Sequence, residues 1–158
     1  ALNYNSVIKR MVDFFKFFKS KKDQASDEEP VDPVQMATAV LLIEMARADF
    51  EQAENENEVS KQLLKDHFDL NNQGTNDLFE EAELIADDSV SLHEFTRTLH
   101  ETLEPEAKEE IIEMLWRLAM SDDDLDKHED YLVRKVADLL YVSNTIVLKI
   151  RHKVTQES

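Results

Sequence analysis

The sequence predicts an all-α protein: a compact bundle of about seven helices with an internal two-fold sequence repeat, plus an amphipathic helix at the N-terminus. Apolar residues recur at helical spacing through most of the chain. Helix-start residues precede these apolar runs, and no long period-two alternation bounded by Gly or Pro indicates a strand. At 158 residues the chain can form one domain with a sizeable core and a short appendage.

The N-terminal segment differs in charge from the rest of the chain. Residues 1–22 hold six basic residues and one acidic residue, and their apolar residues include Phe14, Phe15, Phe17 and Phe18. We predict a basic amphipathic helix over 1–22, an acidic linker over 23–32 and a helical domain over 33–153. A wide apolar face suits docking on the protein's own domain or on a second subunit, and it also suits a tether to a membrane or partner.

Capping signals define the helices of the domain in order. Asp32 followed by Pro33 starts the first helix, which runs to Ala48. The second is expected from about Glu54 to Phe68 and the third over Asn76–Ala86, after a turn marked by Asn71, Asn72 and the only glycine, Gly74. Four later helices start at Ser91 with Glu94, at Pro105, at Asp126 with Glu129, and at Ser143.

Two acidic helix-to-helix corners repeat at an offset of 73 residues. The offset pairs Ile43 with Trp116, Ala46 with Ala119, Asp49 with Asp122, and Glu56 with Glu129. Carboxylate oxygens are the ligands that Ca²⁺ and Mg²⁺ prefer, so the corners predict two half-sites for a divalent cation. The candidate ligands are Asp49, Glu56, Asp122, Asp124, Asp126 and Glu129.

A different explanation of the second corner stays open. Asp126 and Glu129 stand where a capping residue and its reciprocal partner belong, so capping with a solvated acidic loop accounts for them. It does not account for Asp122, Asp123 and Asp124, which crowd negative charge at a helix C-terminus. An EF-hand is disfavoured because Lys127 and Val133 replace the required Gly and Glu at loop positions 6 and 12.

Composition excludes several classes of function. A net charge of −17 argues against nucleic-acid binding, and the absence of cysteine removes thiolate catalysis and Cys-based zinc sites. A single glycine excludes P-loop and dinucleotide motifs. His93 and His100, seven residues apart, offer only a weak case for zinc or iron. No run of about 18 apolar residues occurs. We therefore expect a cytoplasmic protein that is not an enzyme, and contact with the inner face of the membrane through residues 1–22 stays open.

Three segments carry a resemblance to a known family. They are VLLIEMARAD, HEFTRTLHETL and EMLWRLAMSDDDLDKHEDYLVRKVADLLYVS, and with the duplicated corner they resemble the TerB family of tellurite-resistance proteins from Val34 to Arg151. The resemblance implies an all-helical domain proposed to bind divalent metal in bacterial stress responses, with no catalytic activity. It departs at three places: Phe50 and Asp123 replace the glycine after each corner Asp, and Ala53 stands where the second copy has Asp126.

These observations lead to two hypotheses of function. The first is a non-enzymatic domain that binds a divalent cation in a response to tellurite, metal or oxidant stress. The second is an acidic scaffold or adaptor that recruits an unknown protein partner or the membrane without an ion, since acidic helices attract basic partners. Either hypothesis is compatible with an oligomer, so the oligomeric state is left open.

Overall fold

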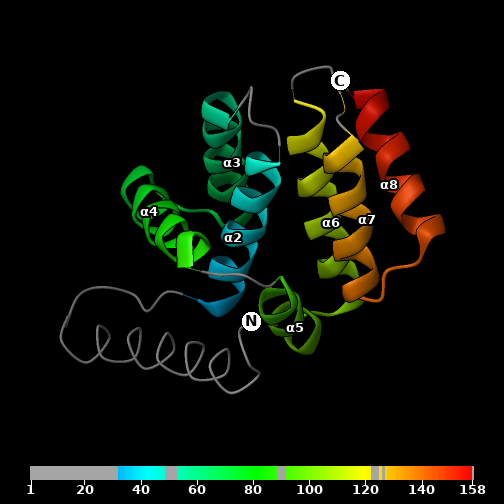
Figure 1. Ribbon diagram of the computed structural model, residues 1–158, viewed down its shortest axis with the longest axis horizontal. Coiled ribbons are helices and arrows are strands. Elements are labelled where there is room, and N and C mark those ends of the chain that lie inside the picture. The colour runs from blue at the N-terminus through cyan, green and yellow to red at the C-terminus, as the bar shows by residue number, and fades with distance from the viewer. Residues whose placement is uncertain (1–31, 49–52, 89–91, 122–124, 126, 158) are drawn as a thin grey trace. The chain divides into compact units, whose positions relative to one another are not determined.

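The computed structural model describes residues 32–48, 53–88, 92–121, 125 and 127–157. Within these ranges all regular structure is helical, in seven helices, which confirms the predicted all-α class. The helices are α2 (Pro33–Arg47), α3 (Ala53–Phe68), α4 (Asn72–Asp88), α5 (His93–Thr102), α6 (Pro105–Ala119), α7 (Lys127–Leu139) and α8 (Asn144–Glu157) (Figure 1).

The chain divides into two compact units, Ala1–Asp32 and Pro33–Ser158. The predicted helix over 1–22 lies outside the described residues, as does the predicted linker over 23–32 apart from Asp32. Both therefore stay predictions. In the second unit α8 continues to Glu157, beyond the predicted domain end at residue 153. No helix in the described ranges is long and apolar enough to cross a membrane.

Two helices form the centre of the second unit. α2 contacts α3, α4, α5 and α6, while α6 contacts α2, α3, α7 and α8. α2 is buried along most of its length, and its one buried polar side chain, Thr38, donates its hydroxyl hydrogen to the Val34 carbonyl at 2.7 Å. Full burial of each large apolar side chain contributes about 1.5–3 kcal/mol. The central pair therefore supplies much of the core.

The turns after α3 and α7 have the same backbone geometry. Asp69 follows α3 with φ 53°, and Tyr141 follows α7 with φ 59°. In both turns the amide of the next residue donates to the carbonyl five residues before it, at 3.0 and 2.9 Å respectively. This is the left-handed cap that closes many helices. The two turns are 72 residues apart, close to the offset of 73 residues between the acidic corners.

The helices that follow these turns are also capped alike. The Asn71 side-chain oxygen accepts the Gly74 amide at 2.7 Å, and the Ser143 hydroxyl oxygen accepts the Ile146 amide at 3.4 Å. The predicted Ser143 cap is thus confirmed. The predicted start of the third helix at Asn76 is wrong, because capping by Asn71 lets α4 begin at Asn72 and places Gly74 inside it.

The start of α5 shows no side-chain cap. Its N-cap residue is Leu92, which makes no side-chain capping hydrogen bond. Ser91, the predicted capping residue, lies outside the described residues. α6 begins at Pro105 as predicted, because the fixed φ of proline suits the first helical turn and no amide is lost there.

Candidate functional site

The two acidic corners are the connections from α2 to α3 and from α6 to α7. We call Arg47–Glu56 the first corner and Ala119–Glu129 the second. α2 and α6 are in contact, and Figure 1 shows them running in the same direction, so that both finish at the end of the domain where α3 and α7 begin. The fold therefore brings the flanks of both corners to one end of the domain.

Of the six candidate ligands, the structure describes two. Glu56 lies in the first turn of α3 and Glu129 in the first turn of α7, and each side chain is 0% exposed. Asp49, Asp122, Asp124 and Asp126 lie outside the described residues. The sequence-based assignment of these four as ligands therefore stays a prediction.

Full burial distinguishes Glu56 and Glu129 from the other acids. Among the side chains that the structure describes, they are the only Asp or Glu in the buried class. Glutamate is almost never fully buried unless its charge is compensated, because removing a carboxylate from water costs several kcal/mol. A position in the first helical turn contributes to that compensation, since the positive end of the helix dipole favours anions. Both glutamates occupy the same position relative to their corner, which favours a shared role for the two buried carboxylates.

Another buried polar residue lies on the same helix as Glu56. Ser60 follows Glu56 by one turn of α3, is fully buried, and its hydroxyl has no hydrogen-bond partner among the residues that the structure describes. Residues four apart share a helix face, so this oxygen lies on the face that carries the buried carboxylate. The equivalent residue of α7 is Val133, also buried. The interior beside the first corner thus has an oxygen that the second lacks.

Sequence reasoning missed Ser60, although a signal for it was present. Its spacing of four from Glu56 puts both residues on one helix face, but nothing in the sequence distinguishes that face from the solvent side, because α3 also carries polar residues around its circumference. Spacing therefore groups the residues, whereas burial requires the packed structure.

An ion pair lies beside the first corner. The Arg47 guanidinium at the end of α2 donates to the Asp87 carboxylate near the end of α4 at 2.7 Å. Burial raises the pKa of the nearby Glu44 carboxyl; Arg47 lowers this pKa and Asp87 raises it further. A cation at a helix C-terminus also offsets the negative end of the dipole. Arg47, Asp87 and Glu44 therefore contribute to the electrostatic potential near the first corner, although none of them is a predicted ligand.

The described residues do not form a complete metal site by themselves. Across these ranges, no group of three or more His, Cys, Asp or Glu side chains is arranged to hold a metal ion. The predicted donor set depends instead on adding the four acids at 49, 122, 124 and 126. As carboxylates, all six candidates present oxygen, the donor type that fits Ca²⁺ or Mg²⁺.

The protein is thus an all-helical domain. Among its described residues, the buried acids are Glu56 in the first turn of α3 and Glu129 in the first turn of α7. The sequence profile of one family, described as tellurite resistance protein TerB, matches residues 35–152, which is most of the chain. The chain belongs to this family. No curated protein matches the chain, nor does any solved structure.

Proposed function

We propose that this TerB-family protein binds a divalent cation at its two acidic corners and serves a bacterial response to tellurite, metal or oxidant stress without catalysing a reaction. The observation that carries the proposal is the complete burial of Glu56 and Glu129 at equivalent positions. Membership of the family supports the association with tellurite resistance.

The chemistry of the corners supports a hard cation. Acids that follow α2 and α6 stand near helix C-termini, where the dipole disfavours negative charge. A divalent cation relieves that repulsion and contributes to compensating the buried carboxylates. Because Ala53 replaces the acid found at Asp126, the first corner has one carboxylate fewer. We therefore propose one composite or one weak site in place of two equal sites.

Binding at the corners has a structural consequence in this proposal. The α2–α4 half and the α6–α8 half meet through α2 with α6 and through α3 with α6. A cation shared by acids from both corners favours the packing of the halves in which those acids are closest. The cation then acts as a conformational signal, and a partner that distinguishes the two packings receives it.

Calorimetric titration of the metal-stripped protein with Ca²⁺, Mg²⁺, Mn²⁺ and Zn²⁺ tests the proposal, together with thermal melts. Binding to the native state alone raises its apparent stability, by about 2.7 kcal/mol at 100 times Kd. The test variant is Asp122→Asn with Glu129→Gln. The matched control is Glu106→Gln with Asp138→Asn, which makes the same change of charge at two exposed residues of α6 and α7.

Saturable binding in the wild type and the control, lost in the test variant, supports the proposal. Equal binding in all three proteins places the ion elsewhere and refutes the assignment of residues. No heat and no melting shift at millimolar ion refutes cation binding itself. The adaptor function then becomes the leading hypothesis.

A further inference from the structure

The interior of the domain holds a hydroxyl group without a hydrogen bond. The Ser60 side chain in α3 is 0% exposed, and its hydroxyl has no partner among the residues that the structure describes. The other two serines in the described ranges are bonded. The Ser121 hydroxyl donates to the Leu118 carbonyl at 2.7 Å, and the Ser143 hydroxyl oxygen accepts the Ile146 amide at 3.4 Å. Burying a hydroxyl without a partner costs free energy, so native proteins rarely do so without a reason.

Ser60 does not use the acceptor that a helix normally offers to a hydroxyl. A serine or threonine inside a helix can donate to the carbonyl four residues before it. Five threonines of the described helices do so at 2.7–3.1 Å, namely Thr38, Thr75, Thr96, Thr98 and Thr155. For Ser60 that acceptor is the Glu56 carbonyl, and this hydrogen bond is not formed. The Ser60 oxygen is therefore available to another group.

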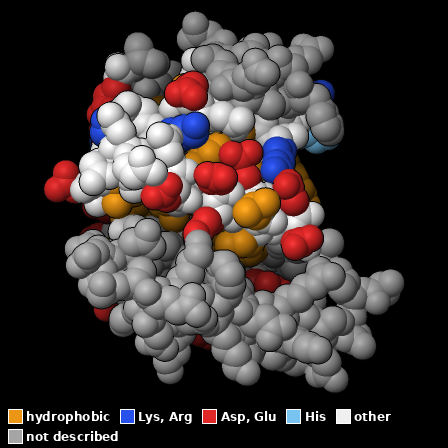
Figure 2. Space-filling model, turned by 90° about the vertical axis from the view of Figure 1, so that its left-hand side faces the viewer, with side chains coloured by type: hydrophobic (Ala, Val, Ile, Leu, Met, Phe, Trp, Pro, Cys, Tyr) orange, Lys and Arg blue, Asp and Glu red, His pale blue; other side chains and the backbone are white. Residues whose placement is uncertain are grey.

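The side chain next to Ser60 on its helix face is a buried carboxylate. Residues four apart share a helix face. Cα–Cβ bonds tilt toward the N-terminus of a helix, so the Ser60 side chain is directed toward the turn of α3 that carries Glu56. Figure 2 shows acidic side chains on the surface of the α4 side, where water solvates them, whereas Glu56 and Ser60 are both 0% exposed. A carboxylate and a hydroxyl thus share an enclosed position beside the first corner.

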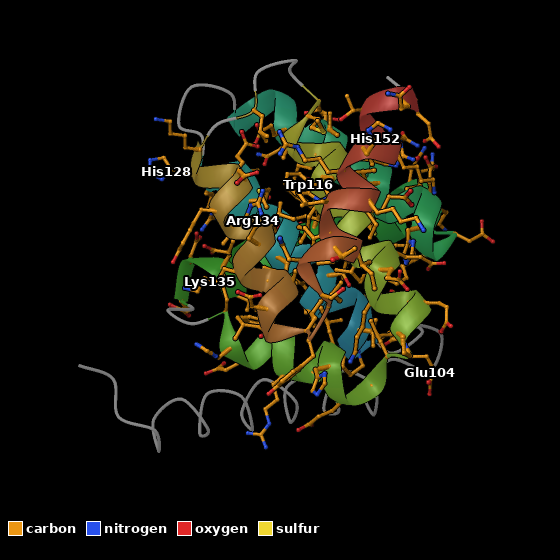
Figure 3. The ribbon with its side chains drawn as sticks, turned by 90° about the vertical axis from the view of Figure 1, so that its right-hand side faces the viewer. Glu104, Trp116, His128, Arg134, Lys135 and His152 are labelled. Atoms are coloured by element: carbon orange, nitrogen blue, oxygen red, sulfur yellow. The ribbon has the colours of Figure 1, made fainter. Side chains whose placement is uncertain are left out.

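The equivalent face of α7 has no hydroxyl. At the offset of 73 residues, Glu129 corresponds to Glu56 and Val133 corresponds to Ser60. Exposed His128 is directed outward from the first turn of α7 (Figure 3), while Glu129 and Val133 are 0% exposed. Valine is an ordinary residue for a buried helix position, and serine is not. Ser60 is therefore a difference between two otherwise matched interiors.

The first corner, which has Ser60, is also the corner that lacks an acid, because Ala53 replaces the acid found at Asp126. We propose that Ser60 supplies a neutral oxygen ligand to the divalent cation of the composite site, next to the Glu56 carboxylate. This inference rests on the proposed cation binding and extends the ligand set beyond the six acids. A hydroxyl oxygen is a hard donor of the kind that Ca²⁺ and Mg²⁺ accept. It adds a ligand without adding negative charge to a site that is rich in carboxylates.

Full burial of these two ligands selects between the two ions. A cation that contacts Glu56 and Ser60 is enclosed by protein, because neither side chain is exposed. It must therefore exchange much of its hydration shell for protein oxygens. Mg²⁺ gives up its waters reluctantly, whereas Ca²⁺ accepts more oxygen ligands in a more flexible geometry. The site is expected to bind Ca²⁺ at least about tenfold more tightly than Mg²⁺.

Thermal melts and calorimetric titrations of the full chain test the inference with Ser60→Ala. In EDTA this variant is expected to raise Tm by about 6 °C, because it removes an unsatisfied buried hydroxyl; about 2 °C of the rise reflects the higher helix propensity of Ala. In titrations of metal-stripped protein, the Kd for Ca²⁺ is expected to rise at least about tenfold. A serine with a purely structural role does not stabilise the ion-free protein and weaken ion binding when it is removed.

Thr38→Val is the matched control. It also removes a buried hydroxyl, since Thr38 is 1% exposed, but this hydroxyl already donates to the Val34 carbonyl. Valine keeps the shape of the side chain. The Tm of this variant in EDTA is expected to equal or lie below that of the wild type, and its Kd for Ca²⁺ is expected to equal the wild-type value.

Four outcomes would overturn the inference, and they separate it from the proposed function. A rise in Tm of about 2 °C or less for Ser60→Ala in EDTA shows that the hydroxyl is already satisfied. A larger rise with wild-type affinity for Ca²⁺ removes Ser60 from the ligand set and leaves the proposed function intact. Equal loss of affinity in Thr38→Val assigns the effect to core packing. Wild type that binds no ion refutes the proposed function, and this inference with it.

Discussion

Replacement of Trp116 by Phe tests how α6 is joined to α8. The indole is fully buried, and its Nε1–H donates to the Val147 carbonyl at 3.2 Å. The Arg151 guanidinium carbon lies 5.5 Å from the centre of the Trp116 ring. Phe keeps the apolar character of the site but removes the donor and one ring. The change therefore removes a hydrogen bond and leaves a cavity at the same time.

The cost of Trp116→Phe follows from these contacts. A lost hydrogen bond costs about 0.5–1.5 kcal/mol. The volume lost is a fraction of a Trp→Ala change, which costs about 3–5 kcal/mol, so about 1–2 kcal/mol is assigned to the cavity. A weaker cation–π contact adds a few tenths. The total is about 2–4 kcal/mol, or a fall in Tm of roughly 8–16 °C for a domain of this size.

Thermal unfolding followed by far-UV circular dichroism measures this, since Trp116 is the only tryptophan and its fluorescence is lost with it. Ile43→Val, at the equivalent position of α2, is the control and is expected to cost about 0.5–1.5 kcal/mol. Benzothienylalanine at position 116 keeps the bicyclic shape without the N–H and isolates the hydrogen bond. A loss below about 1 kcal/mol for Trp116→Phe would show that this reasoning about the α6–α8 contact is wrong.

Two further predictions concern exposed and half-buried residues. Tyr141→Gly is expected to stabilise the domain by about 0.5 kcal/mol: relief of the left-handed φ of 59° outweighs the lost ring contact with His100 and the greater freedom of glycine when unfolded. An unchanged or lower Tm contradicts it. The pKa of Glu44 is raised in the folded state, chiefly by burial, so its contribution to stability falls as pH rises from the ordinary Glu value through the raised value. Glu44→Gln is therefore expected to make the free energy of unfolding, measured by urea titration, depend less on pH in that range. A pH profile identical to that of the wild type refutes this prediction.

The helices could be predicted where local chemistry decides them. Pro105 at a first turn and the Ser143 hydroxyl as a cap fix their helix starts with almost no help from the rest of the fold. The start of α4 was mispredicted because Asn71, Asn72 and Gly74 all favour turns. One hydrogen bond to the Asn71 side chain decides among them, and a glycine inside a helix costs only about 1 kcal/mol. A cost of that size is easily overridden by packing.

The candidate site was only partly predictable, for a different reason. Equal spacing in two copies identified Glu56 and Glu129, because duplicated positions stand out in a sequence whatever their surroundings. Their burial depends on how α3 and α7 turn toward α6, which no local pattern determines. Ser60 was missed for the same reason, since its burial also depends on how the helices pack. Sequence thus identifies residues that share a position, and packing decides whether that position lies in water.

The two halves of the domain are alike in one region and different in another. At the corners the halves match, with a buried glutamate in each, whereas on the outer helices they differ in sign, with Asp77 in one half and Lys149 in the other. Matched acids can share one cation, which requires like ligands. Likeness at the corners and difference in charge on the outer helices are therefore separate features of the two halves, and the cation titration tests what the first of them does.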